Sequence, residues 1–332
     1  MLNELKGKKL VAWGATSKLF EFCVTRLEEY SFAYLVDSNT TLQGTKLHGL
    51  EVRSPETLDT ESAEDSAVVL FAVSNLALQE MLASLRVKGF LLGKNVFLYS
   101  DLFAQEYAAT FTAVLGRAPD ERLLRLAQSF CLHVNLPVHT TMLGNALFLE
   151  LLSCVARSAP SAAIAEVGAF NGGNALLASQ YLLHGEQPPF YVIDSFEGFP
   201  ELSKHDPAAK KAGDYAIEKS YESIVDQFAV FPNVRVLKGF VPDVFHRLKA
   251  SDRFSLVFYD CDLYQPALDT FEYFWDRLIP GGYMLVHDYV AETNGFHGVR
   301  KATDEFFAKK GVQVHEFWEN TMGLIIKPGH LA

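Results

Sequence analysis

Two stretches of the sequence place acidic groups directly after an apolar run. One predicted strand ends at Asp260, and Asp262 follows two positions later. A second predicted strand ends just before His287 and Asp288. Residues i and i+2 of an extended segment point to the same side, so Asp260 and Asp262 repel each other unless a cation or a proton joins them. This spacing is therefore suited to binding a divalent cation or to moving a proton.

The two stretches must also lie side by side for this chemistry to occur. In the usual order of a doubly wound sheet the two strands are neighbours, and ligands bind at the carboxyl ends of the strands. Carboxylates there favour Mg2+, Ca2+ or Mn2+, and a histidine softens that preference. The structural alternative is two acids that cap a helix, together with a loop histidine. Both interpretations stay open at this stage.

A glycine-rich turn lies earlier in the chain. Ala163–Val167 is short and apolar and is predicted to be a buried strand, and Asn174–Leu183 is predicted to be a helix. The turn between them contains Gly168, Gly172 and Gly173, with Glu166 two positions before the first glycine. Small residues allow a ligand to approach the backbone, and a helix N-terminus offers free N–H groups. The alternative is an ordinary strand-to-helix turn.

Two further strand ends carry residues that suit a nucleoside. Phe190–Ile193 is a predicted strand that runs into Asp194, whose carboxylate can accept both ribose hydroxyls. A later strand, Asn233–Leu237, is followed by Lys238, Gly239 and Phe240. Phe196 and Phe240 would either form apolar walls for an adenine or belong to the core.

The second half of the chain alternates strands with helices, which predicts a parallel sheet. Pro266–Leu278 and Val299–Lys309 have helical patterning, and Pro280-Gly281-Gly282 is expected to be a turn before the strand Tyr283–Val286. Val312–Phe317 and Met322–Ile326 form a predicted antiparallel pair at the end. We therefore predict an α/β fold with a seven-stranded, doubly wound sheet.

The first hundred residues predict a smaller Rossmann-like α/β domain. Strands are expected at Lys9–Trp13, Phe32–Val36, Ala67–Val73 and Asn95–Tyr99, with helices at Leu19–Tyr30 and Asn75–Val87 and a helix start at Ser54-Pro55-Glu56. Gly14 and Asp37 could serve a nucleotide, but Thr16 and Leu19 replace the other two glycines of the dinucleotide fingerprint. We favour a scaffold or partner-docking role, with nucleotide or nucleotide-sugar binding as the alternative.

The expected domains are residues 1–104, a helical linker at 105–140, and residues 141–332. Asp101–Leu115 and Asp120–Leu132 are predicted helices of the linker region, and Leu143–Val155 is a strongly apolar helix after it. Apolar helices in this region predict a homo-oligomer.

Composition narrows the class of partner. The chain has 332 residues, 49% of them hydrophobic, and a formal net charge of −11. A basic face is needed to bind nucleic acid, so no nucleic-acid partner is expected. The four cysteines form no CxxC pair, and the polar N-terminus and short apolar runs predict neither a signal peptide nor a membrane span. A soluble, cytoplasmic protein is expected.

Residues 141–327 resemble the macrocin O-methyltransferase (TylF-type) family of sugar O-methyltransferases. The matching motifs are Thr141-Met142, Glu166–Gly173, Asp194–Pro200, Leu237–Phe240, Tyr259–Tyr264, Pro280–Tyr283 and His287–Tyr289. The resemblance implies the class I fold of methyltransferases that use S-adenosylmethionine (SAM), with SAM as the methyl donor and Mg2+ as the metal. The residues expected to bind SAM are Thr141, Met142, Glu166, Gly168, Phe170, Asn171, Gly172, Asp194, Ser195, Phe196, Gly239, Phe240 and Asp260.

The resemblance also implies roles for the acidic stretches. Asp260 and Asp288 would be metal ligands with His287 beside them, and Asp262 would be the general base. The family usually has Asp-Asp-Tyr where this chain has His287-Asp288-Tyr289, which leaves metal dependence open.

The predicted function is SAM-dependent methylation of a hydroxyl of a glycoside or another polyhydroxylated natural product. The polar insertion at residues 199–220, which contains Lys204, His205, Lys210, Lys211 and Tyr215, is expected to cover the acceptor or else to be a solvated loop. Two alternatives differ in class. One is a metal-independent methyltransferase with His287 as the base. The other is an inactive, methyltransferase-like protein that binds a nucleotide sugar or acts as a scaffold.

Overall fold

The computed structural model describes residues 5, 7–14, 20, 30–72, 74–289 and 297–329. The chain divides into two compact units, Met1–Ala109 with Ser129–Thr141 and Thr110–Gln128 with Met142–Ala332. Most of the predicted helix at 19–30 lies outside the described residues. No helix in the described part of the chain has the length and apolar character needed to cross a membrane.

The first unit contains a six-stranded sheet with the order β3-β4-β2-β1-β5-β6. Its strands are β1 (Lys9–Trp13), β2 (Phe32–Val36), β3 (Lys46–Leu47), β4 (Leu50–Arg53), β5 (Ser66–Leu70) and β6 (Val96–Leu98). The predicted strands pair in parallel, as expected of a Rossmann-like unit. Because β3 and β4 are short, polar and at the edge of the sheet, the apolar pattern did not indicate them.

Of the helices predicted in this region, one has the predicted bounds and one is of another type. The helix α3 (Asn75–Val87) has the predicted bounds, and the Ser74 hydroxyl accepts a hydrogen bond from the Ala77 N–H at its start. The predicted start at Ser54 leads into the 3-10 helix η1 (Pro55–Thr60) and not an α-helix. The chain continues through α4 (Tyr99–Leu102), α5 (Ala104–Leu115) and α6 (Glu121–His133).

The second unit contains a seven-stranded sheet with the order β12-β13-β11-β10-β7-β8-β9. Its strands are β7 (Ala163–Val167), β8 (Phe190–Asp194), β9 (Val234–Lys238), β10 (Phe254–Tyr259), β11 (Leu278–Val286), β12 (Val314–Phe317) and β13 (Met322–Ile326). Strands β7 to β11 are parallel, while β13 runs antiparallel to both β11 and β12. This topology confirms the predicted doubly wound sheet with a closing hairpin.

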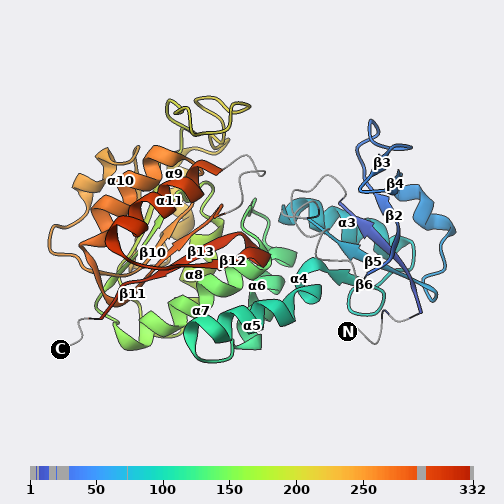
Figure 1. Ribbon diagram of the computed structural model, residues 1–332, viewed down its shortest axis with the longest axis horizontal. Helices are drawn as coiled ribbons and strands as arrows, with labels where there is room; N and C mark the ends of the chain where they lie inside the picture. The colour runs from blue at the N-terminus through green and yellow to red at the C-terminus, as the bar shows by residue number, and fades with distance from the viewer. Residues whose placement is uncertain are drawn as a thin grey trace. The chain divides into compact units, whose positions relative to one another are not determined.

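Helices cover both faces of this sheet (Figure 1). They are α7 (Met142–Ser158), α8 (Gly173–Leu182), α9 (Tyr221–Phe228), α10 (Tyr264–Trp275) and α11 (His297–Lys310), with the 3-10 helices η2 (Asp243–Arg247) and η4 (Trp318–Asn320). Neighbouring residues of β10 point to opposite faces: the Phe258 ring lies 5.0 Å from Phe148 of α7, and the Tyr259 ring lies 5.6 Å from Phe271 of α10. These buried aromatic contacts fix β10 between the two helix layers.

One predicted turn is wrong. Pro280, Gly281 and Gly282 lie inside β11, which begins at Leu278. The Gly281 N–H donates to the Lys327 carbonyl, and the Lys327 N–H donates to the Gly282 carbonyl. Strand pairing with the residues that follow β13 thus outweighs the turn preference of the Pro-Gly-Gly sequence.

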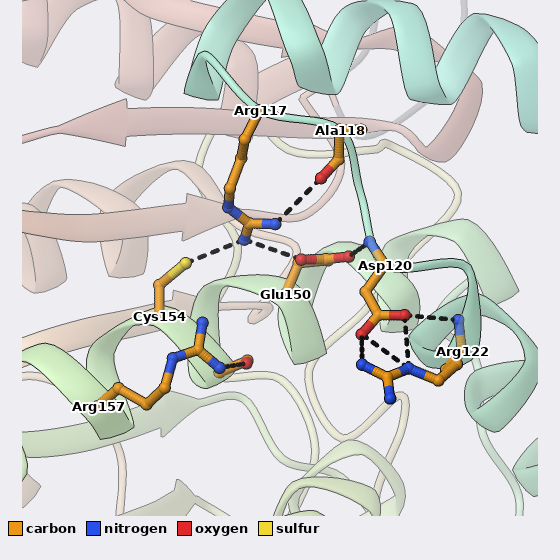
Figure 2. Close-up of polar contacts among 8 residues, drawn as sticks. Arg117, Ala118, Asp120, Arg122, Glu150, Cys154 and Arg157 are labelled. Atoms are coloured by element: carbon orange, nitrogen blue, oxygen red, sulfur yellow. Dashed lines mark hydrogen bonds and ion pairs between the residues drawn. The ribbon is translucent and has the colours of Figure 1, made fainter.

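An ion pair between a half-exposed arginine and a buried glutamate attaches the segment between α5 and α6 to α7 (Figure 2). The Arg117 guanidinium lies 2.8 Å from Glu150 of α7 and donates to the Cys154 sulfur at 3.0 Å. The Asp120 N–H donates to the other carboxylate oxygen of Glu150. Glu150 is buried, with 2% of its surface exposed. Because the buried Glu150 carboxylate would lose its cationic partner without Arg117, this contact favours the observed placement of the segment between α5 and α6.

Candidate active site

The parallel strands of the second unit end in turns with an uncommon backbone conformation. A positive φ is found at Phe170 (49°), Phe196 (56°), Asp262 (62°) and Asp288 (55°), which follow β7, β8, β10 and β11. Side-chain-bearing residues seldom adopt this conformation, and they cluster at functional sites where the surrounding structure maintains it. The carboxyl end of this sheet is therefore the candidate site.

Gly168 allows two of these turns to touch. Its φ is 97°, and a Cβ atom there would lie 2.2 Å from the Asp260 carbonyl oxygen. No side chain fits in that space, so the glycine lets the turn after β7 lie directly against the end of β10. Gly172, with φ 77°, starts α8, and a Cβ there would lie 2.9 Å from the Phe228 ring. The glycines thus place the turn beside the acidic residues.

Glu166 is the fourth residue of β7, two positions before Gly168, and it is fully buried. Neither of its carboxylate oxygens has a hydrogen-bond partner among the described residues. Burial raises its pKa well above the usual value, the charge of Asp260 raises it further, and the nearby Asn174 amide partly opposes both. A buried carboxylate with one amide nearby and no hydrogen bond of ordinary geometry fits a ligand that brings a cationic or hydrogen-bonding group.

Asp194 holds the ends of two loops together. One carboxylate oxygen accepts the Phe170 N–H at 2.8 Å, and the other accepts the Phe196 N–H at 2.5 Å. Burial raises the pKa of Asp194 to about 6, although these backbone N–H groups oppose the shift. Carboxylate oxygens are acceptors only, so this side chain at the strand end suits the hydroxyl groups of a bound ligand.

The predicted acidic stretches do converge. One ligand atom from each of Asp260, Asp262, His287 and Asp288 lies within 4.8 Å of the others. The His287 Nδ1 is 2.7 Å from an Asp260 oxygen and 3.6 Å from an Asp288 oxygen. All four residues are partly buried, and three carboxylates with one imidazole form a donor set that suits a divalent cation.

The charges of this cluster change its proton affinities. Burial opposes protonation of His287, but the charges of Asp260 and Asp288 and the hydrogen bond to Asp260 raise its pKa to about 9. Burial raises the pKa of Asp262 well above its usual value, and the charge of Asp288 adds to that shift. Asp262 is therefore a stronger base than an exposed aspartate.

The other predicted residues lie on nearby loops or at the start of α7. Thr141 and Met142 are buried, and Met142 is the first residue of α7. The Ser195 hydroxyl donates to the Gly198 carbonyl, and the Asn171 carbonyl lies 3.4 Å from the Gln227 side-chain nitrogen. Gly239 follows β9 with φ 158°, and Phe240 is 37% exposed.

The sequence did not single out two residues that the structure brings to this edge. Asn174 lies in the first turn of α8 near Glu166, and its position just after the glycines was the available signal. Asp206 accepts the Tyr264 N–H at the start of α10 at 2.7 Å. It is 58 residues away in sequence, and no local pattern indicates such a contact.

Comparisons with known proteins identify the family of the chain. The chain matches the Macrocin-O-methyltransferase (TylF) family over residues 111–323. A curated relative from Streptomyces olivaceus, 8-demethyl-8-(2,3-dimethoxy-alpha-L-rhamnosyl)-tetracenomycin-C 4'-O-methyltransferase, is 26% identical over 174 residues. That alignment covers 48% of this chain and 66% of the relative, slightly less than two thirds of its length.

Solved structures of methyltransferases are also similar. Calicheamicin methyltransferase CalS11 is 17% identical with a TM-score of 0.47, and the alignment covers 62% of this chain and 91% of that one. The O-methyltransferase NovP is 19% identical with a TM-score of 0.47, and the alignment covers 69% and 99% of the two chains. The first 110 residues lie outside the family match, but the match spans well over half of the sequence. The chain therefore belongs to the macrocin-O-methyltransferase (TylF) family.

Proposed function

We propose that this protein is a SAM-dependent O-methyltransferase that methylates a hydroxyl of a sugar or another polyhydroxylated natural product. The observation that carries the proposal is the convergence of four ligand atoms from Asp260, Asp262, His287 and Asp288 beside the glycine turn. Family membership supports the reaction class. The relative that acts on a rhamnosyl group supports a glycoside acceptor.

The glycine turn and its neighbours fit the parts of SAM. Gly168 and Gly172 pack the turn closely against Asp260 and Phe228. The buried carboxylate of Glu166 beside this turn suits the ammonium group of the methionine part, directly or through water. Asp194 can accept the ribose hydroxyls, with Phe196 and Phe240 as the walls for the adenine. Bound SAM supplies an electrophilic methyl group on a sulfonium.

The acidic cluster fits a divalent cation such as Mg2+. Asp260, His287 and Asp288 would hold the ion, and a cation there lowers the pKa of a coordinated hydroxyl. The chain's own contribution is to position three ligands on the turns after β10 and β11 and to keep them partly buried. Partial burial strengthens their interaction with a cation relative to exposed carboxylates.

Asp262 is proposed as the general base. Its positive φ places the carboxylate in the cluster, and its raised pKa makes it a better proton acceptor than an ordinary aspartate. In that role Asp262 would accept the proton that the acceptor hydroxyl loses.

The pairing of Asp260 with His287 favours a second candidate, a metal-independent methyltransferase with His287 as the base. A histidine whose pKa is about 9 is protonated at neutral pH and accepts a proton only in alkaline solution. The two mechanisms therefore differ in pH dependence, since the His287 mechanism requires activity that rises up to about pH 9.

Transfer of a labelled methyl group from SAM to a panel of glycosides tests the proposal. We expect product with at least one glycoside, and we expect EDTA to suppress its formation and Mg2+ to restore it. No transfer to any acceptor, with no binding of SAM, would support an inactive scaffold. Activity that survives both EDTA and Asp260→Asn would rule out the metal mechanism.

A further inference from the structure

We propose that Lys210 and Tyr215, in the insertion after β8, form the recognition site for the sugar ring of the acceptor. The Tyr215 ring would support the apolar face of the sugar, and the Lys210 ammonium would donate to one of its hydroxyls. This inference rests on the proposed function, since it identifies the residues that select the acceptor of that reaction. The first observation that supports the inference is the set of contacts that attach the insertion to the rest of the second unit.

The insertion is closed at its base by backbone hydrogen bonds. The Phe199 N–H donates to the Asp214 carbonyl, and the Gly213 N–H donates to the Phe199 carbonyl, each at 2.9 Å. Glu197 and Ala216 form an isolated antiparallel bridge beside them. Residues 200–212 therefore form a loop with a fixed base next to Asp194, and they project from the second unit (yellow in Figure 1).

The far side of the loop is attached to the start of α10. Asp206 is 8% exposed, and one of its oxygens accepts the Tyr264 N–H at 2.7 Å. The His205 ring lies 4.5 Å from the Tyr264 ring. Because Tyr264 follows Asp262 by two residues, the insertion spans from the end of β8 to the acidic cluster. The insertion is therefore attached to α10 as well as at its base, and it is not an unattached surface loop.

Lys210 and Tyr215 contact each other within the insertion. The Lys210 Nζ donates to the Tyr215 hydroxyl at 3.2 Å and lies 4.5 Å from the centre of its ring. The Tyr215 ring is 6.2 Å from Phe170 of the glycine turn and 5.0 Å from Phe199. Tyr215 adopts φ 64°, a conformation that needs support from its surroundings.

The contacts of the pair connect it to the proposed site. Tyr215 contacts Phe170 of the glycine turn, and Lys210 contacts Tyr215. Asp206 of the same loop accepts the Tyr264 N–H, two residues after Asp262. A methyl acceptor that reaches both the turn and Asp262 would therefore meet this pair.

The chemistry of the pair matches a sugar. Tyr215 is 40% exposed although Phe170, Phe199 and Lys210 contact it, so part of its aromatic surface faces solvent. The face of an aromatic ring is electron-rich and attracts the slightly positive C–H groups of an apolar sugar face. A lysine ammonium has three donors and no acceptor, which suits a hydroxyl oxygen. Substrate pockets commonly combine one apolar surface with a few placed polar groups in this way.

Saturation-transfer NMR with methyl α-L-rhamnopyranoside as the probe tests the assignment. The glycoside is titrated into the full chain in the presence of S-adenosylhomocysteine, and its dissociation constant is compared among Tyr215→Ala, Tyr215→Phe, Lys210→Met and Lys211→Met. Lys211 is the matched control, because it is the adjacent, exposed lysine of the same loop. Calorimetry with S-adenosylhomocysteine is performed on each variant.

We expect Tyr215→Ala and Lys210→Met to raise the glycoside dissociation constant by about tenfold, in line with a lost aromatic contact or a lost charged hydrogen bond. Tyr215→Phe keeps the ring and should retain most of the affinity, and Lys211→Met should match the unmodified protein. Affinity for S-adenosylhomocysteine should change by less than about twofold, which a general loss of structure would not allow.

Two results would overturn the inference. One is a glycoside affinity that is the same in Tyr215→Ala and Lys210→Met as in Lys211→Met. The other is the absence of saturation transfer to the glycoside in the unmodified protein. In both cases, normal binding of S-adenosylhomocysteine would leave the proposed methyltransferase function standing, whereas its absence would count against that function itself.

Discussion

Each unit of the chain has a glycine in the turn after its central strand, but only one of the two turns lies beside acidic residues. Gly14 follows β1 with φ 109°, and a Cβ there would lie 2.4 Å from the Phe71 carbonyl oxygen. Gly168 follows β7 with φ 97° and would meet the Asp260 carbonyl oxygen at 2.2 Å. Each glycine packs its turn against the backbone after a neighbouring strand. A glycine at this position is thus required by the architecture of the sheet and does not by itself indicate a ligand.

The acids that follow the second strands differ between the units. Asp37, after β2, accepts the N–H of Asn39 in its own loop at 2.9 Å. Asp194, at the end of β8, accepts the N–H of Phe170 across from it in the glycine turn. The residues after the neighbouring strand differ further: Phe71 and Ala72 follow β5, whereas Asp260 and Asp262 follow β10. The chemistry of the second unit therefore comes from its acids, not from its turn.

The largest effect in this comparison should come from replacing an acid of the second unit. We expect Asp262→Asn to lower methyl transfer by about 100- to 10,000-fold, since a positioned general base contributes on that scale. The matched change in the first unit, Asp37→Asn, should leave the transfer rate unchanged. Rates are measured with labelled SAM and the best glycoside acceptor. A rate for Asp262→Asn within about threefold of the unmodified protein would remove its role as the base.

Replacing Gly14 and Gly168 in turn should distinguish an effect on stability from an effect on SAM binding. Both Gly168→Ala and Gly14→Ala force a Cβ against a carbonyl oxygen at positive φ, so each should destabilise its own unit by about 3 kcal/mol or more. Urea unfolding measures this loss. Only Gly168→Ala should also abolish binding of SAM. If Gly14→Ala abolished SAM binding while Gly168→Ala retained it, the assignment of the site to the second unit would be wrong.

The acidic cluster should give the protein a characteristic pH dependence. The pKa of His287 is about 9 in the folded protein and 6.5 when the residue is free. The stabilisation from its protonated form is therefore complete below pH 6.5 and is lost as the pH rises to about 9, an effect of up to about 3 kcal/mol. Urea unfolding in EDTA at pH 6 and pH 9 measures the difference. His287→Asn should reduce it, and an unchanged difference in that variant would assign the effect to other groups.

Metal affinity should respond more modestly to the loss of one ligand. We expect Asp288→Asn to weaken Mg2+ binding by on the order of tenfold or more, because a neutral amide replaces a charged oxygen ligand. Calorimetric titration with Mg2+ measures it, and Asp304→Asn, on α11, serves as the control outside the cluster. Equal Mg2+ affinity in the two variants would argue against a metal site at Asp288.

Most of the fold was predictable because buried strands and helices leave clear apolar patterns. The parallel order of the second sheet followed from alternating elements, and the convergence of Asp260 with His287 followed from that order. The strand β3 and the residues Pro280–Gly282 were missed, because their strand form depends on pairing with a neighbour and not on their own composition. The local sequence does not indicate pairing with a distant segment.

The backbone conformation of the candidate site was harder to predict than the identity of its residues. Positive φ at Phe170, Asp262 and Asp288 is imposed by neighbouring turns, and no local preference of these residues indicates it. The long-range contacts of Asp206 and Arg117 depend on distant parts of the chain. The sequence therefore predicted that the acidic cluster forms, but it predicted neither the backbone conformation of its residues nor their long-range contacts.

The central claim is that the second unit, and not the first, binds SAM at its strand ends. The most direct test is calorimetric titration of SAM into the unmodified chain, Asp194→Asn and Asp37→Asn. We predict a single saturable site, weakened at least about tenfold by Asp194→Asn through loss of a charged acceptor for the ribose hydroxyls. Asp37→Asn should leave the affinity unchanged. No SAM binding, or a loss of affinity in Asp37→Asn alone, would contradict the claim.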